Sequence, residues 1–213
     1  MTRRHESRPR EATAPYRDVA AFDDRADGYD LGWRGRLHHE IIDRTAQLVI
    51  ADAGSPNRVL DLGCGTGHLL RVLAGHYPDG AEFTGIDAAP RMIEVANSLG
   101  HDTRVAFAVG VAEQLPYPDG AIDLIVSTTS FDHWSDQQAG LRECARVLRP
   151  GGRLVLVDQF SCWLLPTLLT SRRGKARTKR RANRLLLRAG LQHPEWHHLY
   201  AVIIKTVIAT KPA

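Results

Sequence analysis

The sequence has few cysteines and no long apolar run. Its three cysteines, Cys64, Cys144 and Cys162, lie far apart, in no spacing typical of a metal site or a disulfide framework. No apolar stretch approaches the roughly 20 residues of a membrane-spanning helix. The arginine-rich start is not followed by the apolar core of a secretory signal. In 213 residues we therefore expect one cytoplasmic domain without a structural metal.

Acidic residues are missing from one stretch near the end of the chain. Residues 159–194 contain nine Lys or Arg and no Asp or Glu, whereas the whole chain has 28 basic and 24 acidic residues. The rest of the chain therefore has 19 basic residues against all 24 acids, so the basic character is local. Residues 1–17 are rich in Arg, Pro and Glu without apolar periodicity, which predicts a disordered basic tail.

A glycine-rich turn follows the first predicted strand, in the segment RVLDLGCGTG at 58–67. Gly63, Gly65 and Gly67 have no Cβ atom to keep a ligand from the backbone, and they tolerate positive φ. The helix that follows points its free N–H groups at the same place. Asp61 adds a carboxylate at the carboxyl end of the strand, where open α/β sheets bind ligands. This combination favours a ligand with a positive charge and hydroxyls over one dominated by pyrophosphate.

The spacing of the glycines separates two kinds of nucleotide site only in part. It reads G-x-G-x-G, whereas the dinucleotide fingerprint is G-x-G-x-x-G with an acid about 20 residues further on. A second predicted strand, residues 83–87, ends in Asp87, and a carboxylate there can accept both hydroxyls of a ribose. These features indicate a nucleoside ligand and leave a nicotinamide cofactor as an alternative.

Four segments in a fixed order extend this pattern over residues 59–158. They are VLDLGCGTGHLL at 59–70, FTGIDAAPRMIEVA at 83–96, AEQLPYPDGAIDLIVS at 112–127 and LRECARVLRPGGRLVLVD at 141–158. Together they resemble the class I S-adenosylmethionine-dependent methyltransferases, in particular the group that includes quinone and sterol methyltransferases. The resemblance implies S-adenosylmethionine as the cofactor. It also implies an α/β, Rossmann-like fold with a seven-stranded sheet, mostly parallel with an antiparallel last strand, and helices on both faces.

The end of the chain fits this topology. Two predicted strands, 196–200 and 202–209, are separated by too few residues for a crossover helix, so they must pair antiparallel. His193 is the histidine of this region that we consider for a pocket wall. Within a domain expected over 18–213, we assign cap helices to 18–57, the cofactor-binding core to 58–160, an apolar and basic lid with its helix to 161–190, and terminal strands to 191–213.

The resemblance places cofactor residues along the carboxyl edge of the sheet. Tyr29, in FDDRADGYD, matches the lid tyrosine of the family's entrance helix, whereas Phe22 is expected only to pack that helix on the sheet. Val111 replaces an aspartate frequent in the family, so adenine recognition must rely on Ala112, Glu113 or apolar stacking. The full set expected at the cofactor is Tyr29, Asp61, Gly63, Cys64 as a small turn residue, Gly65, Gly67, Asp87, Ala88, Met92, Val111, Ala112, Glu113 and Ser127.

The segment after the fourth strand, STTSFDHW at 127–134, lacks a [DN]-P-P-[FY] tetrad. That tetrad positions exocyclic amines in nucleic-acid adenine and glutamine N-methyltransferases, so its absence argues against those substrates. His133 is the candidate general base because imidazole titrates near neutral pH, with a wall or core role as an equal alternative. His38 and His39 are neighbours on a helix expected over 36–51, so they face different directions, and we expect surface or capping roles.

An apolar segment, 162–169, runs directly into a basic one, 172–188. If residues 176–189 form a helix, its apolar and its basic residues lie in two separate stripes. The apolar stripe is Ala182, Leu185, Leu186 and Ala189, and the basic stripe is Arg177, Arg181, Arg184 and Arg188. A solvated face explains four arginines, and contact of 161–188 with an anionic membrane is the functional alternative. Nucleic acid is the least favoured partner because no aromatic residues alternate with the arginines.

The sequence predicts an enzyme that moves a methyl group to a small, apolar or aromatic acceptor. The reaction is an in-line displacement, so alignment and exclusion of water are the main tasks of the protein. A non-catalytic S-adenosylmethionine-binding regulatory or scaffold protein is the second hypothesis, encouraged by Val111, and a nicotinamide oxidoreductase is the third. The acceptor, the methylated atom and the oligomeric state are not predicted, because fold resemblance does not supply them.

Overall fold

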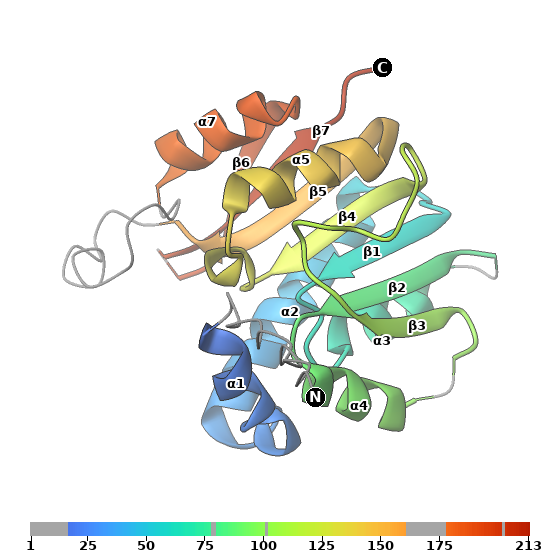
Figure 1. The fold of residues 1–213 in the computed structure, drawn as a ribbon, viewed down its shortest axis with the longest axis vertical. Coiled ribbons are helices and arrows are strands. Elements are labelled where there is room, and N and C mark those ends of the chain that lie inside the picture. Colours follow the sequence, from blue (N-terminus) through green and yellow to red (C-terminus); the bar gives the residue numbers. More distant parts are fainter. Residues whose placement is uncertain (1–16, 78–79, 101, 161–177, 202) are drawn as a thin grey trace, which may run out of the picture.

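A seven-stranded sheet forms the centre of the computed structural model, which describes residues 17–77, 80–100, 102–160, 178–201 and 203–213 (Figure 1). The strand order is β3-β2-β1-β4-β5-β7-β6. The strands are β1 (Arg58–Leu62), β2 (Glu82–Asp87), β3 (Val105–Val109), β4 (Ile122–Thr128), β5 (Leu148–Gln159), β6 (Gln192–Tyr200) and β7 (Ile204–Thr210). The order reverses between β1 and β4, which is the place where open α/β sheets bind ligands.

The sheet is parallel from β3 to β5, and β7 pairs antiparallel with both β5 and β6. Within this sheet only β7 therefore runs against its neighbours. Trp196 pairs with Val207 across the terminal hairpin, as expected for strands joined by a short link. The predicted mostly parallel sheet with an antiparallel last strand is confirmed.

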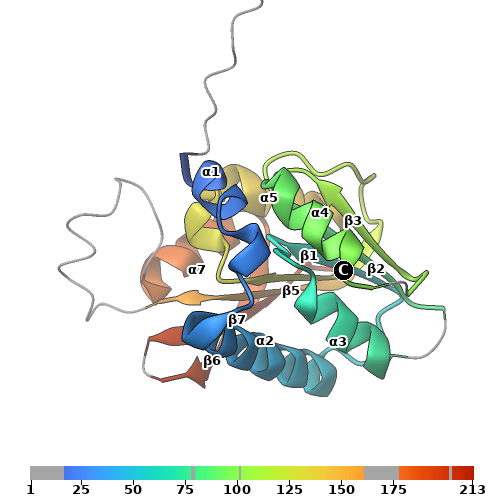
Figure 2. The ribbon, with the colours of Figure 1, turned by 90° about the horizontal axis from the view of Figure 1, so that it is seen from below.

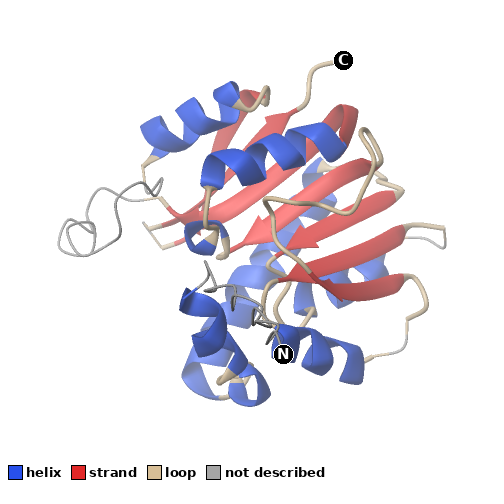
Figure 3. Cartoon of the chain, in the orientation of Figure 1, coloured by secondary structure: helices blue, strands red, loops and turns tan. Residues whose placement is uncertain are grey.

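Helices cover both faces of the sheet (Figures 2 and 3). On one face lie α2 (Gly32–Asp52) and α3 (His68–His76), and on the other α5 (Gln137–Val147) and α7 (Lys179–Arg188). The short helix α1 (Arg17–Asp23) and the 3₁₀ turn η1 (Ala26–Gly28) pack against α4 (Pro90–Ser98). A second 3₁₀ turn, η2 (Phe131–His133), follows β4. The predicted arrangement with helices on both faces is confirmed.

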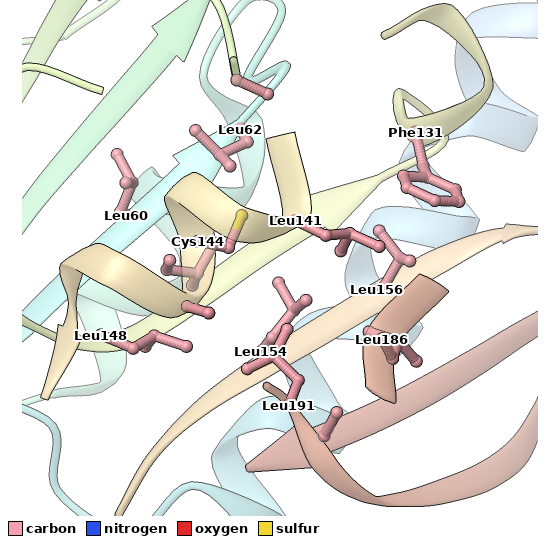
Figure 4. Packing of buried hydrophobic residues seen from close by; sticks show 14 of the residues in the cluster. Leu60, Leu62, Phe131, Leu141, Cys144, Leu148, Leu154, Leu156, Leu186 and Leu191 are labelled. Atoms are coloured by element: carbon pink, nitrogen blue, oxygen red, sulfur yellow. The ribbon is translucent and has the colours of Figure 1, made fainter. Parts of the chain in front are cut away.

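The core consists of two apolar layers separated by the sheet. Figure 4 shows the layer beneath α5, where Leu141 and Cys144 meet Leu154 and Leu156 of β5 and Leu186 of α7. All five side chains are fully buried. The central strands are apolar on both sides because helices cover both of their faces. Cys144 is therefore a core residue, and burial holds the pKa of its thiol well above the usual range.

The N-terminal segment differs from the single entrance helix that we expected from the resemblance. α1 ends at Asp23, η1 follows, and α2 begins only at Gly32. Gly32 has a φ of 71°, in the left-handed region that glycine tolerates at no steric cost. The chain reverses there, so Tyr29 lies at a turn between two helices instead of on a helix.

β5 begins at Leu148, which pairs with Ile122, and its register with β4 shifts between Ile122 and Leu124. The helix expected over 176–189 is described from Lys179, and Arg177 lies outside the described residues.

Parts of two further predictions concern residues that the structure does not describe. The expected tail falls on residues 1–16, and the apolar part of the expected lid falls on 161–177. In the described part of the chain, none of the helices combines the length and apolarity needed to cross a bilayer.

Candidate functional site

A cavity of about 450 Å³ opens at the carboxyl ends of β1, β2 and β4. Its floor comes from the ends of these strands, and its side walls come from the segments after β3 and β4. The N-terminal cap, formed by α1, η1 and the start of α2, supplies the remaining wall. The cavity therefore lies at the reversal of strand order, and segments distant in sequence enclose it.

Most of the residues expected at the site lie around this cavity. Those that line it are Tyr29, Gly63, Gly65, Asp87, Ala88, Met92, Val111, Ala112, Glu113 and His133. Asp61, Cys64, Gly67 and Ser127 lie behind the lining residues. The structure thus brings ten of the expected residues to one cavity, and their individual roles stay predictions.

The three glycines of the turn have different surroundings. A Cβ atom on Gly63 would overlap the side chain of Ser130, and one on Gly67 would overlap Phe107. At Gly65 the nearest atom to such a Cβ is Tyr29 Cε1, at 3.9 Å. The space beside Gly65 therefore belongs to the cavity, and a ligand can approach the backbone there.

Asp87 is held at the end of β2 by two backbone donors. Its Oδ2 accepts from the Gly65 N–H at 2.8 Å and its Oδ1 from the Ala89 N–H at 2.9 Å. Burial raises the pKa of this carboxyl, and the two hydrogen bonds oppose that shift. Each carboxylate oxygen can accept a further hydrogen bond, so the group suits the adjacent hydroxyls of a ribose.

Asp61 lies beneath the turn and is almost fully buried. Its Oδ1 has no hydrogen-bond partner. Burial, together with the nearby Asp87, raises the pKa of Asp61 to about 8. A cation bound in the adjacent cavity would favour the ionised form, because opposite charges lower the pKa of a carboxyl. The unpartnered atom fits the expectation of a positively charged ligand at this edge of the sheet.

Hydroxyl groups hold the wall that follows β4. Ser130 Oγ donates to the Leu62 carbonyl at 2.7 Å, and Ser127 Oγ lies 2.7 Å from Ser130 Oγ. The Trp134 indole N–H donates to the same Ser130 oxygen at 3.4 Å. Ser127 is fully buried, so it positions the wall from behind and does not face the cavity.

Two threonines of the same wall have unusual states, and neither was singled out from the sequence. Thr128 lines the cavity, and its buried Oγ1 has no hydrogen-bond partner. Thr129 has a φ of 54°, which is strained for a β-branched residue, while its N–H donates to the Val157 carbonyl at 2.8 Å. Strained and unpaired groups gather at functional sites, so both threonines join the candidate residues.

Four aromatic rings form a continuous arch over the cavity, called here the ring roof: His38, Tyr29, Phe22 and His133. The Tyr29 and His38 rings meet edge to face with centroids 5.0 Å apart, and Phe22 lies 6.4 Å from Tyr29. Phe22 also meets His133 at 5.0 Å. Burial raises the pKa of Tyr29 to about 12 and lowers the pKa of His38 to about 4. Both side chains are therefore neutral near pH 7.

The ring roof corrects three expectations. Phe22, expected only to pack a helix, lines the cavity, where its ring contacts Tyr29 and His133. His38, expected at the surface, lines it as well, whereas His39 stacks on His68 and donates to Asp30 at 2.8 Å. His193 does not line the cavity and is exposed on β6.

A buried carboxylate lies close to the segment that carries His133. Asp158, near the end of β5, accepts from the Asp132 N–H at 3.0 Å and from the Gln159 N–H at 2.6 Å. Burial raises the pKa of Asp158 to about 6, although these hydrogen bonds and the nearby His133 oppose the shift. The sequence signal for this residue was an acid that ends an apolar strand.

The opposite end of the cavity is apolar. Met92 is buried in a cluster with Ala26 and Ala89, and Val111 forms an isolated bridge with Gln114. Glu113 Oε1 accepts from the Asp136 N–H at 2.9 Å, which connects this wall to the start of α5. In the described ranges no group of three or more His, Cys, Asp or Glu side chains is arranged to hold a metal ion.

Comparison with known proteins agrees with this geometry. Residues 60–156 match the family described as methyltransferase domain. The chain is 36% identical over 149 residues to the uncharacterized methyltransferase YcgJ of Bacillus subtilis, covering 68% of this chain and 51% of that protein. It is 38% identical over 133 residues to demethylmenaquinone methyltransferase of Thermus thermophilus, covering 62% and 56%. The chain thus spans about half the length of these curated relatives.

A solved structure extends the likeness over almost the whole chain. It is a putative methyltransferase in complex with the Trm112 methyltransferase activator of Haloferax volcanii, with a TM-score of 0.77 and 19% identity. The match covers 94% of this chain and 98% of that one, and at this identity it concerns the fold. By its matched domain, fold and motifs, the chain contains a class I S-adenosylmethionine-dependent methyltransferase domain, with S-adenosylmethionine as the cofactor of that domain.

Proposed function

We propose that this protein transfers the methyl group of S-adenosylmethionine to a small apolar or aromatic acceptor bound beneath the ring roof. The observation that carries the proposal is the convergence of Gly65, Asp87 and the ring roof on one cavity. The first two suit a nucleoside with a charged tail, and the roof suits a flat apolar partner. We also propose that residues 18–213 form one methyltransferase domain, with cytoplasmic location as a further expectation.

The residues present fit the cofactor along the length of the cavity. Gly63 and Gly65 would hold the amino-acid end beneath Tyr29, where only a residue without a Cβ leaves room. Asp87 would accept from the ribose hydroxyls. The adenine would lie against the apolar end, bounded by Met92 and Val111. Ala88, Ala112 and Glu113 complete this end of the wall.

S-adenosylmethionine supplies a methyl group that its sulfonium already activates for displacement. The chain has to align the acceptor with that methyl group and to exclude water. The ring roof performs the second task because Phe22 and Tyr29 cover the cavity with apolar surface. His38 and Tyr29 are both neutral near pH 7, and the positive charge nearest to these rings is the Arg25 guanidinium, 5.0 Å from the centroid of the Phe22 ring.

The acceptor side of the cavity combines apolar rings with a few polar groups. Thr128 offers an unpartnered hydroxyl, and His133 lies opposite the cap with its ring against Phe22. For an acceptor with a phenol or enol hydroxyl, His133 would take the proton as the oxygen attacks. The Thermus relative is named for demethylmenaquinone, which supports an acceptor of this apolar kind.

The first test is calorimetric titration with S-adenosylhomocysteine of the wild type and the Asp87→Ala variant. We expect binding by the wild type and its loss in the variant, with thermal melting as the check on folding. Methyl transfer from labelled S-adenosylmethionine to a panel of lipid-soluble phenols and quinones then tests the reaction. Tight binding without transfer to any acceptor of the panel would instead favour a regulatory or scaffold role.

A further inference from the structure

The basic helix α7 has one face buried against the rest of the protein. Ala182 and Leu186 are fully buried, and Leu185 packs partly buried against the same core layer. The Trp196 indole N–H donates to Asn183 at 2.9 Å, and Lys179 lies over the Trp196 ring at 5.1 Å. These contacts fix the rotation of the helix, so its outward face is determined.

The outward face consists of four exposed arginines around one exposed leucine, here called the arginine face. Its members are Arg180, Arg181, Arg184, Leu187 and Arg188. Spacings of three and four residues put side chains on one side of a helix. The four arginines, with Thr178 and Leu185, line a surface hollow of about 460 Å³. Positive charge is therefore gathered around a concave area and not scattered along the helix.

No carboxylate of the described residues compensates this charge. Within the ranges that the structure describes, none of the four arginines forms an ion pair with an Asp or Glu. The first turn of α7 carries Lys179, Arg180 and Arg181 and no acid, although the N-terminus of a helix favours negative charge. Other exposed arginines of this protein do have acids beside them, for example Arg91 with Asp27. A bound external anion would reduce the repulsion among the unpaired arginines. It would also offset the unfavourable positive charge at the N-terminus of the helix.

The composition of the arginine face indicates the kind of anion. Leu187 is 56% exposed among the guanidinium groups, and an apolar side chain within a basic face is typical of helices that lie at a membrane interface. Guanidinium groups bind phosphate oxygens through paired N–H donors. Trp196, the aromatic residue that packs beside this helix, is occupied by Lys179 and Asn183, so it offers no free face for stacking on a base. Phospholipid headgroups fit this face because they offer phosphate oxygens to the guanidinium groups and an apolar boundary to Leu187. They also need no aromatic ring for stacking.

We infer that the arginine face binds the phosphate groups of an anionic membrane surface and holds the protein there peripherally, with Leu187 at the headgroup boundary. Each basic residue close to such a surface contributes about a five-fold gain in partitioning. Four arginines together give about two orders of magnitude or more. Because the attraction is electrostatic, binding falls as the salt concentration rises.

The test is sedimentation of the full chain with vesicles of phosphatidylcholine alone and with vesicles of about three parts phosphatidylcholine to one part phosphatidylserine. We expect binding to the second kind only. A variant with Arg180, Arg181, Arg184 and Arg188 all changed to Gln should lose about a hundredfold or more in partitioning. The same four changed to Lys should keep most of the binding, because the charge is retained.

A charge-matched control uses exposed arginines elsewhere, namely Arg34, Arg36, Arg58 and Arg142, all changed to Gln. This variant should bind the anionic vesicles almost as well as the wild type. An equal loss in both Gln variants would overturn the inference, because net charge would then be responsible. Tighter binding to single-stranded DNA at matched phosphate concentration would overturn it in favour of another anion. So would release from vesicles by inorganic phosphate at an ionic strength at which sodium chloride leaves the protein bound. No assay here requires methyl transfer, so failure is distinguishable from failure of the proposed reaction.

Discussion

The ring of Phe22 meets the imidazole of His133 edge to face, with centroids 5.0 Å apart and planes at 87°. Phe22 belongs to α1, and His133 ends η2, after the fourth strand. This contact joins the N-terminal cap to the wall that follows β4, and both rings line the cavity.

Shortening Phe22 should open the roof without disturbing the cofactor end. We expect Phe22→Ala to raise KM for the acceptor about tenfold, since an edge-to-face pair and its burial contribute about 1–1.5 kcal/mol. Affinity for S-adenosylhomocysteine, measured by calorimetry, should change little. Leu31→Ala is the control because Leu31 is 70% exposed on the same segment. A weakened cofactor with an unchanged acceptor KM would contradict this role.

His133 should matter in the chemical step if the acceptor carries an acidic hydroxyl. We expect His133→Ala to reduce kcat about a hundredfold at saturating acceptor, the lower range for loss of a general base. His133→Gln, which keeps a polar side chain, should behave like the alanine variant. Unchanged turnover in both would show that His133 is only part of the wall.

Removal of the Thr128 hydroxyl should weaken ligand binding without lowering the stability of the fold, because this hydroxyl is buried without a hydrogen-bond partner. Thr128→Val removes that hydroxyl at nearly constant volume, so thermal melting of the ligand-free protein should stay equal or rise. Binding of the ligand that uses the hydroxyl should weaken by about threefold to tenfold, the effect of one hydrogen bond. Thr206→Val is the matched control, since Thr206 Oγ1 is also buried and unpartnered but lies on β7 away from the cavity. Equal binding losses in both variants would contradict the assignment.

A side chain at position 65 should be compatible with folding but should block ligand binding. Gly65 and Gly54 both have positive φ, 52° and 65°, and neither has an atom close enough to overlap an added Cβ. We expect Gly65→Ala and Gly54→Ala to lower stability by a similar amount, about 1 kcal/mol. Only Gly65→Ala should abolish binding of S-adenosylhomocysteine, because its Cβ enters the cavity. Melting curves and calorimetry on both variants test this directly.

Asp61 should make the ligand-free protein less stable as the pH rises. Its pKa is about 8 in the fold against the ordinary value of 3.8, so between these values the folded state retains a proton that the unfolded state has released. The stabilisation is complete at the acid end and is lost as the pH approaches about 8. Asp61→Asn does not titrate there.

The difference between the melting temperatures of wild type and Asp61→Asn should therefore fall from about pH 5 to about pH 8, by about 2–4 °C for each kcal/mol lost. Circular dichroism melts at several pH values measure it. A difference that stays constant over this interval would mean that Asp61 is ionised throughout.

The parts of the site that were predictable depend on local patterns. Each glycine of the turn at 63–67 has a positive φ, and glycine is the residue type that adopts it without strain. Asp87 ends a strand, and the apolar alternation of that strand is visible in the sequence. Phe22 and His38 were placed wrongly because they reach the cavity only through contacts with residues distant in sequence or across the turn between α1 and α2.

The amino-acid sequence by itself determined the antiparallel end, because the link between the last two strands is too short for a crossover helix. It indicated the parallel sheet and the cofactor through the resemblance of four ordered motifs to a known family. Tertiary structure decided which side chains face the cavity. Packing brings Phe22 into contact with both Tyr29 and His133 in the ring roof. It also buries the Thr128 hydroxyl without a hydrogen-bond partner. Contacts between segments far apart in the chain depend on tertiary packing, which produces no periodic pattern in the amino-acid sequence.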